Sequence, residues 1–245
     1  MKQRHIAALL AEAIGTFVLV MVVLNVNRYQ LPFFTAIAAG LTIAAFTSIF
    51  FRISGGHFNP ALTIGLFSIR QISAAKTVGY IAAQALGAVA GWQLFQYFTD
   101  STLKNATTAF NWQIFLAEAV GALIFSMGVV AVVTQKLDKW HAAATIGTAL
   151  FLGATVASLA SNGLVNPALA LGVRSFDLNY FLGPIVGFVV GSLLFAYFLF
   201  PIFSIKKDTK TVSASAPKAA VSAPAKKAVA KKAPAKKSAK KTTKK

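Results

Sequence analysis

Two Asn-Pro-Ala tripeptides carry the most distinctive polar side chains of this sequence. They lie at 59–61 and 166–168, and each precedes a short apolar run. Asn followed by Pro is typical of a helix start, because the Asn side chain caps free N–H groups and Pro fits the first helical position. The predicted chemistry is hydrogen bonding by two side-chain amides. The residues of these boxes are Asn59, Pro60, Ala61, Asn166, Pro167 and Ala168.

Patterns that serve catalysis or metal binding are missing from the sequence. The chain has no Cys, and His5, His57 and His141 are too scattered for a zinc site of the His-x-x-x-His kind. There is also no phosphate-binding glycine loop and no Gly-x-Ser-x-Gly elbow. We therefore expect a protein that is not an enzyme and that has no metal and no cofactor.

The composition divides the chain into an apolar body and a basic tail. Hydrophobic residues make up 56% of the chain and charged residues 12%, against roughly 25% charged in an average soluble domain. Residues 206–245 hold 14 of the 24 Lys and Arg. Because this stretch has few large apolar residues, we expect a disordered Lys/Ala/Pro-rich tail there. The body, residues 1–205, is expected to lie in a lipid bilayer.

Six windows of the body are apolar and long enough to cross a hydrocarbon core of about 30 Å as helices. They are 6–26, 33–52, 76–98, 111–134, 140–160 and 180–204. Two further apolar segments, 54–67 and 162–173, contain the boxes and are too short to cross. Irregular backbone at membrane depth is tolerated only inside protein or beside a wet cavity. We therefore expect two re-entrant segments, each an irregular stretch that leads into a half-helix.

The two halves of the body, about 5–98 and 111–204, repeat each other. Identical residues recur 106 or 107 positions apart, namely Glu12 and Glu118, Gly40 and Gly147, and Asn59 and Asn166. Since each half has three spans, the second half must enter the membrane upside down. Paired interrupted segments in such a repeat indicate the permeation site. The predicted fold class is an all-α membrane protein with six transmembrane helices and two re-entrant half-helices in an inverted repeat.

The basic residues between the spans predict the orientation, because positive charge collects on the cytoplasmic side. With both termini cytoplasmic, the inner side holds Lys2, Arg4, Arg52, Arg70, Lys76, Lys136 and Lys139. The outer side then holds only Arg28, Lys104 and Arg174. We expect an integral protein of the cell membrane with both termini in the cytoplasm.

The string SGGHFNPA at 54–61, the second box and the paired Glu residues resemble the aquaporin and aquaglyceroporin family, the major intrinsic proteins. The resemblance covers about residues 5–204. It implies a passive channel for water or small neutral solutes, assembled as a homotetramer with one pore per subunit. An ion-coupled secondary transporter is the alternative from another class, because inverted repeats with broken helices also serve carriers.

The half-helices are expected to point their N-termini, the positive ends of their dipoles, at each other near the midplane. The amides of Asn59 and Asn166 would then donate to a passing molecule, and the positive field would exclude protons and cations. Backbone carbonyls ahead of each box are expected to form a ladder of acceptors. The ladder residues are Gly55, Gly56, His57 and Phe58 before the first box, and Asn162, Gly163, Leu164 and Val165 before the second.

Glu12 and Glu118 are the only carboxylates within the predicted spans. An ionisable group in a membrane is a candidate for function, here a proton relay. The other interpretation is that each carboxylate accepts hydrogen bonds from its re-entrant loop, and the resemblance favours this support role. His57 has the same two interpretations, a pH gate or a residue that positions the loop.

The resemblance also assigns an outer constriction to four positions, counted from the boxes. They are Ala39, Ala154, Gly163 and Leu169. The last position is usually Arg in the family, so Leu169 predicts a wide, apolar ring and a solute range like that of a glycerol facilitator. A water-selective channel is the alternative. Arg174 cannot replace the missing Arg, because five residues along a helix turn it about 140° away; we expect a cap or interface residue.

Two further features complete the predictions. Small residues at Gly87, Gly91, Gly183, Gly187 and Gly191 allow close helix packing, which we expect to join the two halves. For the basic tail three interpretations stay open: no specific partner, anionic lipid, or nucleic acid bound through its phosphates.

Overall fold

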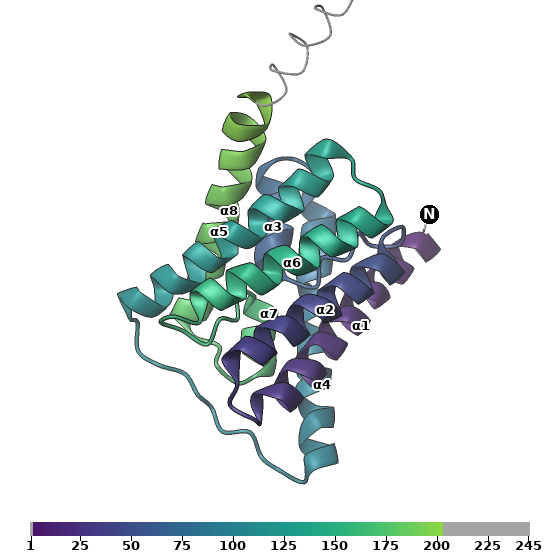
Figure 1. The fold of residues 1–245 in the computed structure, drawn as a ribbon. Coiled ribbons are helices and arrows are strands. Elements are labelled where there is room, and N and C mark those ends of the chain that lie inside the picture. The colour runs from purple at the N-terminus through teal and green to yellow at the C-terminus, as the bar shows by residue number, and fades with distance from the viewer. Residues whose placement is uncertain (1, 203–245) are drawn as a thin grey trace, which may run out of the picture.

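The computed structural model describes residues 2–202, and in this range the chain is helical without strands. Figure 1 shows the long helices as one bundle, with the two short helices lying among them. The helices are α1 (Lys2–Asn27), α2 (Pro32–Phe50), α3 (Pro60–Ser68), α4 (Ala74–Thr99), α5 (Trp112–Gln135), α6 (Lys139–Ala157), α7 (Pro167–Gly172) and α8 (Leu178–Leu194). A π-helical turn, Phe195–Leu199, continues α8.

The six predicted spans are confirmed. Six helices are long and apolar enough to cross a membrane, the last of them running over Leu178–Ile202 through the π-helical turn. Their ends differ from the predicted ones by a few residues. The largest difference between a predicted and an observed C-terminal end is at α6. This helix ends at Ala157 because the chain there continues into the second re-entrant segment. The predicted tail at 206–245 lies outside the described residues.

Each half-helix is held mainly by the opposite half of the repeat. The first one, α3, packs chiefly on α8, while α7 packs chiefly on α4. The α3–α8 contact is close because Gly65 has no side chain: a Cβ there would lie 2.5 Å from Cδ1 of Phe188. This crossed arrangement makes the position of each box depend on the other half.

The glycines predicted to join the halves pack within each half instead, so that prediction is wrong. A Cβ on Gly87 of α4 would lie 2.2 Å from the carbonyl oxygen of Ala13 on α1. The matching Gly187 of α8 lies against Ala119 of α5 in the same way. Besides the α3–α8 contact, α2 and α6 make a close contact between the halves, where a Cβ on Gly147 would lie 2.5 Å from the carbonyl oxygen of Gly40.

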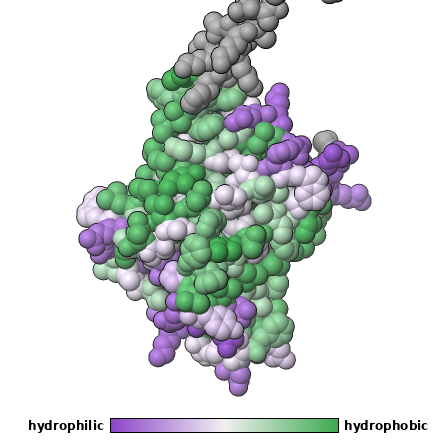
Figure 2. Space-filling model, viewed as in Figure 1, coloured by the Kyte–Doolittle hydropathy of each residue, from purple (hydrophilic) through white to green (hydrophobic). Residues whose placement is uncertain are grey.

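The surface has the pattern of a chain that crosses a bilayer. Figure 2 shows hydrophobic residues over the middle and upper left of one face, with hydrophilic residues gathered at its upper right, its left edge and its lower end. Many large apolar side chains are exposed on the long helices, for example Leu41 on α2, Val78 and Leu86 on α4, and Leu152 on α6. Such a surface is stable in lipid, which solvates apolar side chains as well as a protein interior does.

Candidate functional site

The two boxes cap their half-helices in nearly the same geometry. The Asn59 side chain accepts hydrogen bonds from the N–H groups of Ala61 and Leu62, at 2.8 and 3.4 Å. Asn166 accepts from Ala168 and Leu169, at 3.0 and 3.2 Å. Pro60 and Pro167 each occupy the first helical position. Each Asn therefore uses its side-chain oxygen for its own helix and leaves its NH₂ group for other contacts.

The two Asn NH₂ groups join the boxes to each other. Nδ2 of Asn59 donates to the carbonyl oxygen of Val165 at 2.9 Å, and Nδ2 of Asn166 donates to that of Phe58 at 2.9 Å. Both Asn side chains are buried, with exposed fractions of 1% and 2%. The structure thus brings the two predicted amides together. It also engages two of the predicted ladder carbonyls in this contact.

A strained backbone presents these two carbonyls. Phe58 has φ +48° and Val165 has φ +42°, a region that is rare for residues other than Gly and an outlier for a β-branched one. Such strain persists only where the surroundings impose it and is concentrated at functional sites. Here it turns the chain just before each box, so that the carbonyl faces the opposite Asn.

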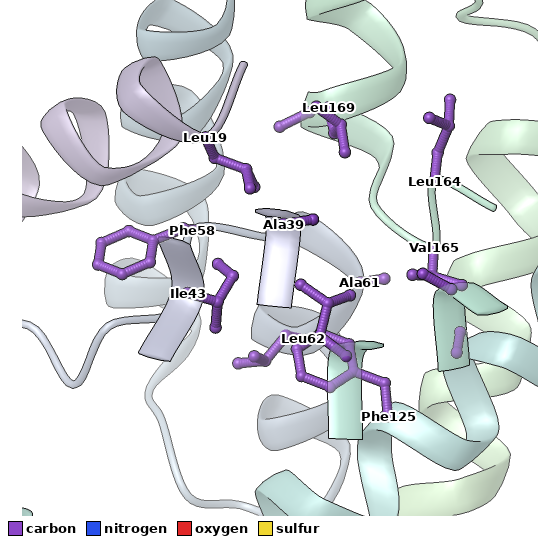
Figure 3. Packing of buried hydrophobic residues seen from close by; sticks show 14 of the residues in the cluster. Leu19, Ala39, Ile43, Phe58, Ala61, Leu62, Phe125, Leu164, Val165 and Leu169 are labelled. Carbon is purple, nitrogen blue, oxygen red and sulfur yellow. The ribbon is translucent and has the colours of Figure 1, made fainter. Parts of the chain in front are cut away.

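Apolar side chains from both halves pack around the boxes. Figure 3 shows Phe58, Ala61 and Leu62 of the first half in one cluster with residues of the second half. The labelled residues of the second half are Phe125, Leu164, Val165 and Leu169. All of them are 5% exposed or less. This packing surrounds the hydrogen bonds between the boxes with apolar side chains, and a low local dielectric strengthens such bonds.

Glu12 holds the first re-entrant loop. Its two carboxylate oxygens accept the N–H groups of His57 at 3.0 Å and Phe58 at 2.7 Å. A third donor, Nε2 of Gln84 on α4, lies 2.8 Å from the carboxylate and 3.1 Å from the hydroxyl of Thr63. The carboxylate is fully buried, so these donors replace the water that a charged group would otherwise need.

Glu118 holds the second loop through matching atoms. It accepts the N–H groups of Leu164 at 3.0 Å and Val165 at 2.6 Å. The hydroxyl of Ser161, which belongs to the loop itself, donates to the same carboxylate at 2.7 Å. Both Glu residues, placed by sequence among the loop supports, therefore lie directly behind the loops that precede the boxes.

Tyrosines on α4 and α8 add a contact to each loop that the sequence analysis missed. The Tyr80 hydroxyl donates to the carbonyl of Ser54 at 2.7 Å, and the Tyr180 hydroxyl accepts the N–H of Asn162 at 3.1 Å. Their sequence separation of 100, the same as between Gly87 and Gly187, is a signal that could have paired them. Gln84 and Thr63 have no polar counterpart at matching positions, so no repeat signal marks them.

His57 lies in the first loop and lines a cavity beside that loop. Its Nδ1 is 3.1 Å from the Thr63 hydroxyl, and its ring meets the Tyr80 ring edge-on with centroids 5.1 Å apart. The cavity has a volume of about 320 Å³. Its lining includes Gly55, Gly56 and His57 of the loop, Lys136, and aliphatic side chains of α3, α5 and α6.

The four constriction residues gather around a second cavity on the other side of the boxes. Ala39, Ala154, Gly163 and Leu169 all line it. Its volume is about 20 Å³, room for about one water molecule. The sequence analysis expected a wide opening, whereas this cavity is small because Leu169 and Leu164 fill the space between the small residues.

Arg174 lies away from this cavity. Its guanidinium stacks on the Trp92 ring of α4, 4.1 Å from the ring centroid. Its carbonyl accepts the N–H of Ala106 from the loop between α4 and α5. The side chain thus contacts an interface between α4 and the segment after α7, and it does not line the cavity that Leu169 lines.

Six spans, two half-helices that meet at their Asn caps, and a cavity on each side of this meeting point define a membrane channel. Comparisons with known proteins agree. The sequence matches the family described as Major intrinsic protein over residues 1–196. The chain belongs to the major intrinsic protein family. Members of this family are passive channels for water and small solutes, not enzymes.

Individual relatives cover most of the chain. It is 33% identical to Aquaporin-2 of Ovis aries over 68% of this chain and 67% of that protein. It is 29% identical to Nodulin-26 of Glycine max over 86% of this chain and 85% of that protein. The match to Aquaporin-4 of Bos taurus, at 30% identity, spans 72% of this chain and 59% of that longer protein.

A solved structure shares the fold. The aquaglyceroporin from Plasmodium falciparum superposes with a TM-score of 0.68 at 21% sequence identity, covering 82% of this chain and 99% of that one. At this identity the likeness supports the fold alone. Which molecules pass through this chain must be argued from its own residues.

Proposed function

We propose that this channel carries water and small uncharged solutes. These solutes include polyols such as glycerol, and also molecules of the size of urea. The observation that carries the proposal is Leu169 at the constriction position where the family usually has Arg. With Leu there, the ring of Ala39, Ala154, Gly163 and Leu169 has no fixed charge and no side-chain donor. Apolar walls suit the carbon faces of polyols.

The small volume of the outer cavity is compatible with this proposal. Three of the four ring residues have no side-chain atom beyond Cβ, so the aperture depends on Leu169 and on the neighbouring Leu164. A Leu side chain can move aside without separating a charge from its partners, which an Arg could not do. The same small volume, about 20 Å³, favours the second candidate, a channel selective for water.

The groups where the two boxes meet favour the exclusion of cations and protons. Two half-helix N-termini carry partial positive charge where the boxes meet, and each Asn amide is a donor held in place by its cap and by the opposite carbonyl. A passing molecule meets donors there and must offer an acceptor, which interrupts a chain of water molecules that would conduct protons. The boxes therefore favour neutral solutes.

The intramembrane carboxylates support passive flow over ion coupling. A coupled carrier needs titratable or ion-binding groups whose contacts change during transport. Glu12 and Glu118 are instead fully buried, each bound to two loop N–H groups and a side-chain donor. We assign them to holding the loops that carry the boxes, and we assign His57 to positioning the first loop.

Stopped-flow measurements on proteoliposomes test the proposal. The full chain should raise the permeability of the vesicles to glycerol, urea and water above that of protein-free liposomes. The flux should be linear in the gradient and unchanged by an imposed proton gradient. Fast water flux with glycerol excluded would select the water channel, and saturable uptake driven by the proton gradient would overturn both candidates.

Four further proposals concern the bounds of the channel domain, its orientation, its membrane and its oligomeric state. We propose residues 1–205 as the channel domain, both termini in the cytoplasm, residence in the cell membrane, and a homotetramer as in the family. The positive-inside pattern of the loops supports the orientation. Binding of the tail to anionic lipid or nucleic acid stays a prediction about residues outside the described range.

A further inference from the structure

The seam between α1 and α4, which lies outside the pore, carries two cavities in line. The first lies at the start of both helices and has a volume of about 300 Å³. The second is a groove of about 290 Å³ formed by Ala13, Ile14 and Phe17 of α1 with Leu86, Gly87 and Ala90 of α4. From Gly79 to Leu86 is seven residues, about 10 Å along the helix axis.

The first cavity is basic and polar at its rim. His5 of α1 and Lys76 of α4 line it, together with Ser73, the N-cap residue of α4. The Lys76 ammonium stands over the Tyr80 ring, 4.8 Å from its centroid. The floor is apolar, formed by Ala8, Leu9 and Gly79 among others. A charged rim over an apolar floor suits a ligand with an anionic head and a hydrocarbon body.

The second cavity is apolar throughout. Every residue that lines it is aliphatic, aromatic or Gly, and Leu86 is 70% exposed. A groove of this kind at membrane depth suits an acyl chain. The order of the two cavities along the seam matches a phospholipid, with its phosphate near the helix ends and its chain deeper in the hydrocarbon.

We propose that the α1–α4 seam binds one anionic phospholipid, with its phosphate beside Lys76 and His5 and an acyl chain in the groove near Ala90. Basic pockets between transmembrane helices bind the head groups of such lipids. Charge complementarity argues against a second copy of the chain as the occupant. Among the described residues, Asp138 is the acidic side chain outside the spans at this end, and it is already paired with His141.

Native mass spectrometry of the full chain tests the site. The chain is released from detergent after incubation with phosphatidylglycerol or with phosphatidylcholine of the same acyl chains. Wild type should retain one phosphatidylglycerol preferentially. Lys76→Ala should lower this retention about five-fold, because one lysine near the surface is worth about 1 kcal/mol. The basic tail is present in every sample, so lipid that it binds adds the same amount to wild type and variant, and the five-fold change applies to the retention above that amount.

Matched controls separate the seam from general basicity. Lys139 lies at the same end of the bundle, with its ammonium 4.2 Å from the centroid of the Trp140 ring. Lys139→Ala should leave retention unchanged. Filling the groove with Ala90→Phe should weaken binding, whereas Val78→Phe, on the same helix outside both cavities, should not.

Three results would overturn the proposal. The first is equal retention by wild type and Lys76→Ala. The second is equal retention of the anionic and the zwitterionic lipid, which would make the seam an ordinary lipid-facing surface. The third is cysteine cross-linking between chains at Ala90→Cys in place of lipid binding, which would show that a second copy covers the seam.

Discussion

The loop before α3 and the loop before α7 are held by matching contacts of a Glu and a Ser side chain to the backbone. In each, a buried Glu accepts the N–H groups of the two residues that precede the box. In each, a Ser side chain accepts the N–H two residues on, Ser54 from Gly56 and Ser161 from Gly163, both at 3.0 Å. Each loop also has a strained residue before the box and one Tyr contact, although Tyr80 donates to a carbonyl whereas Tyr180 accepts an N–H.

The side chains around these contacts differ. In the first half, His57 of the loop, Thr63 of α3 and Gln84 of α4 form one hydrogen-bonded group. The matching positions in the second half are Leu164, Ala170 and Pro184, which have no polar side chain. The cavities differ in volume as well. The cavity beside the first loop has a volume of about 320 Å³, and the cavity beside the second loop has a volume of about 20 Å³.

This comparison separates two tasks. The backbone contacts, which obey the repeat, fix the boxes against each other at the midplane. The side chains that depart from the repeat distinguish the two sides: His57 lines the cavity beside the first loop, while Thr63 and Gln84 are fully buried and do not line it. Variants can therefore be chosen to break the shared contacts or to alter the side chains of one half only.

Removing a loop-supporting carboxylate should have the largest effect. Glu12→Leu and Glu118→Leu each leave two buried N–H groups unpaired, at about 1–3 kcal/mol per group. Each variant should lose about 2–6 kcal/mol of stability, and the two losses should be similar because each also removes the acceptor of one side-chain donor, Gln84 or Ser161. Unfolding of the full chain by sodium dodecyl sulfate in mixed micelles measures the loss. Wild-type stability in either variant would contradict the assigned role.

The boxes should respond equally to truncation. Asn59→Ala and Asn166→Ala each remove a cap, about 1 kcal/mol, and one hydrogen bond across the midplane, about 1 kcal/mol. The two variants should therefore be destabilised alike, by about 2 kcal/mol, since both bonds across the midplane are 2.9 Å long. The same unfolding assay applies. A neutral effect of one variant beside a large effect of the other would refute the symmetry.

Removing Gln84 should reduce the stability of the protein less than removing Glu12. Gln84→Leu removes a hydrogen bond to a carboxylate, about 1.5–3 kcal/mol, but it also removes the buried Gln84 Oε1, which has no partner. These opposing changes should leave a net destabilisation of about 1 kcal/mol. A loss as large as that of Glu12→Leu would show that Gln84 has a role the contacts do not explain.

The smallest effect is expected at Arg174. Arg174→Ala removes a cation–π contact between two half-buried residues, Arg174 and Trp92, about 1 kcal/mol. The ratio of glycerol to water permeability should stay at the wild-type value, because Arg174 does not line the outer cavity. A changed ratio in the stopped-flow assay would place this side chain in the permeation path.

Much of the fold and of the site could be predicted from the sequence because its signals are local. A helix that crosses a bilayer must be long and apolar, so the spans can be recognised from the sequence. The start of each half-helix can be recognised from the tripeptide Asn-Pro-Ala. The paired Glu residues are visible because a charge inside an apolar span is rare.

What the sequence could not reveal depends on contacts between distant segments. Gln84 reaches Glu12 across 72 positions, and nothing in the residues near Gln84 indicates that partner. The contact partners of Gly87 and Gly187 depend on how helices pair. The small outer cavity depends on the rotamers of Leu164 and Leu169, which residue types alone do not determine.

The central claim, that an apolar outer ring containing Leu169 admits small neutral solutes, is tested most directly by the ratio of glycerol to water permeability in Leu169→Arg proteoliposomes. Leu169→Met, which keeps the ring apolar and of similar size, is the matched control. The account predicts that Leu169→Arg lowers glycerol flux more than water flux, while Leu169→Met keeps the wild-type ratio. An equal reduction of both fluxes by Leu169→Arg would contradict it.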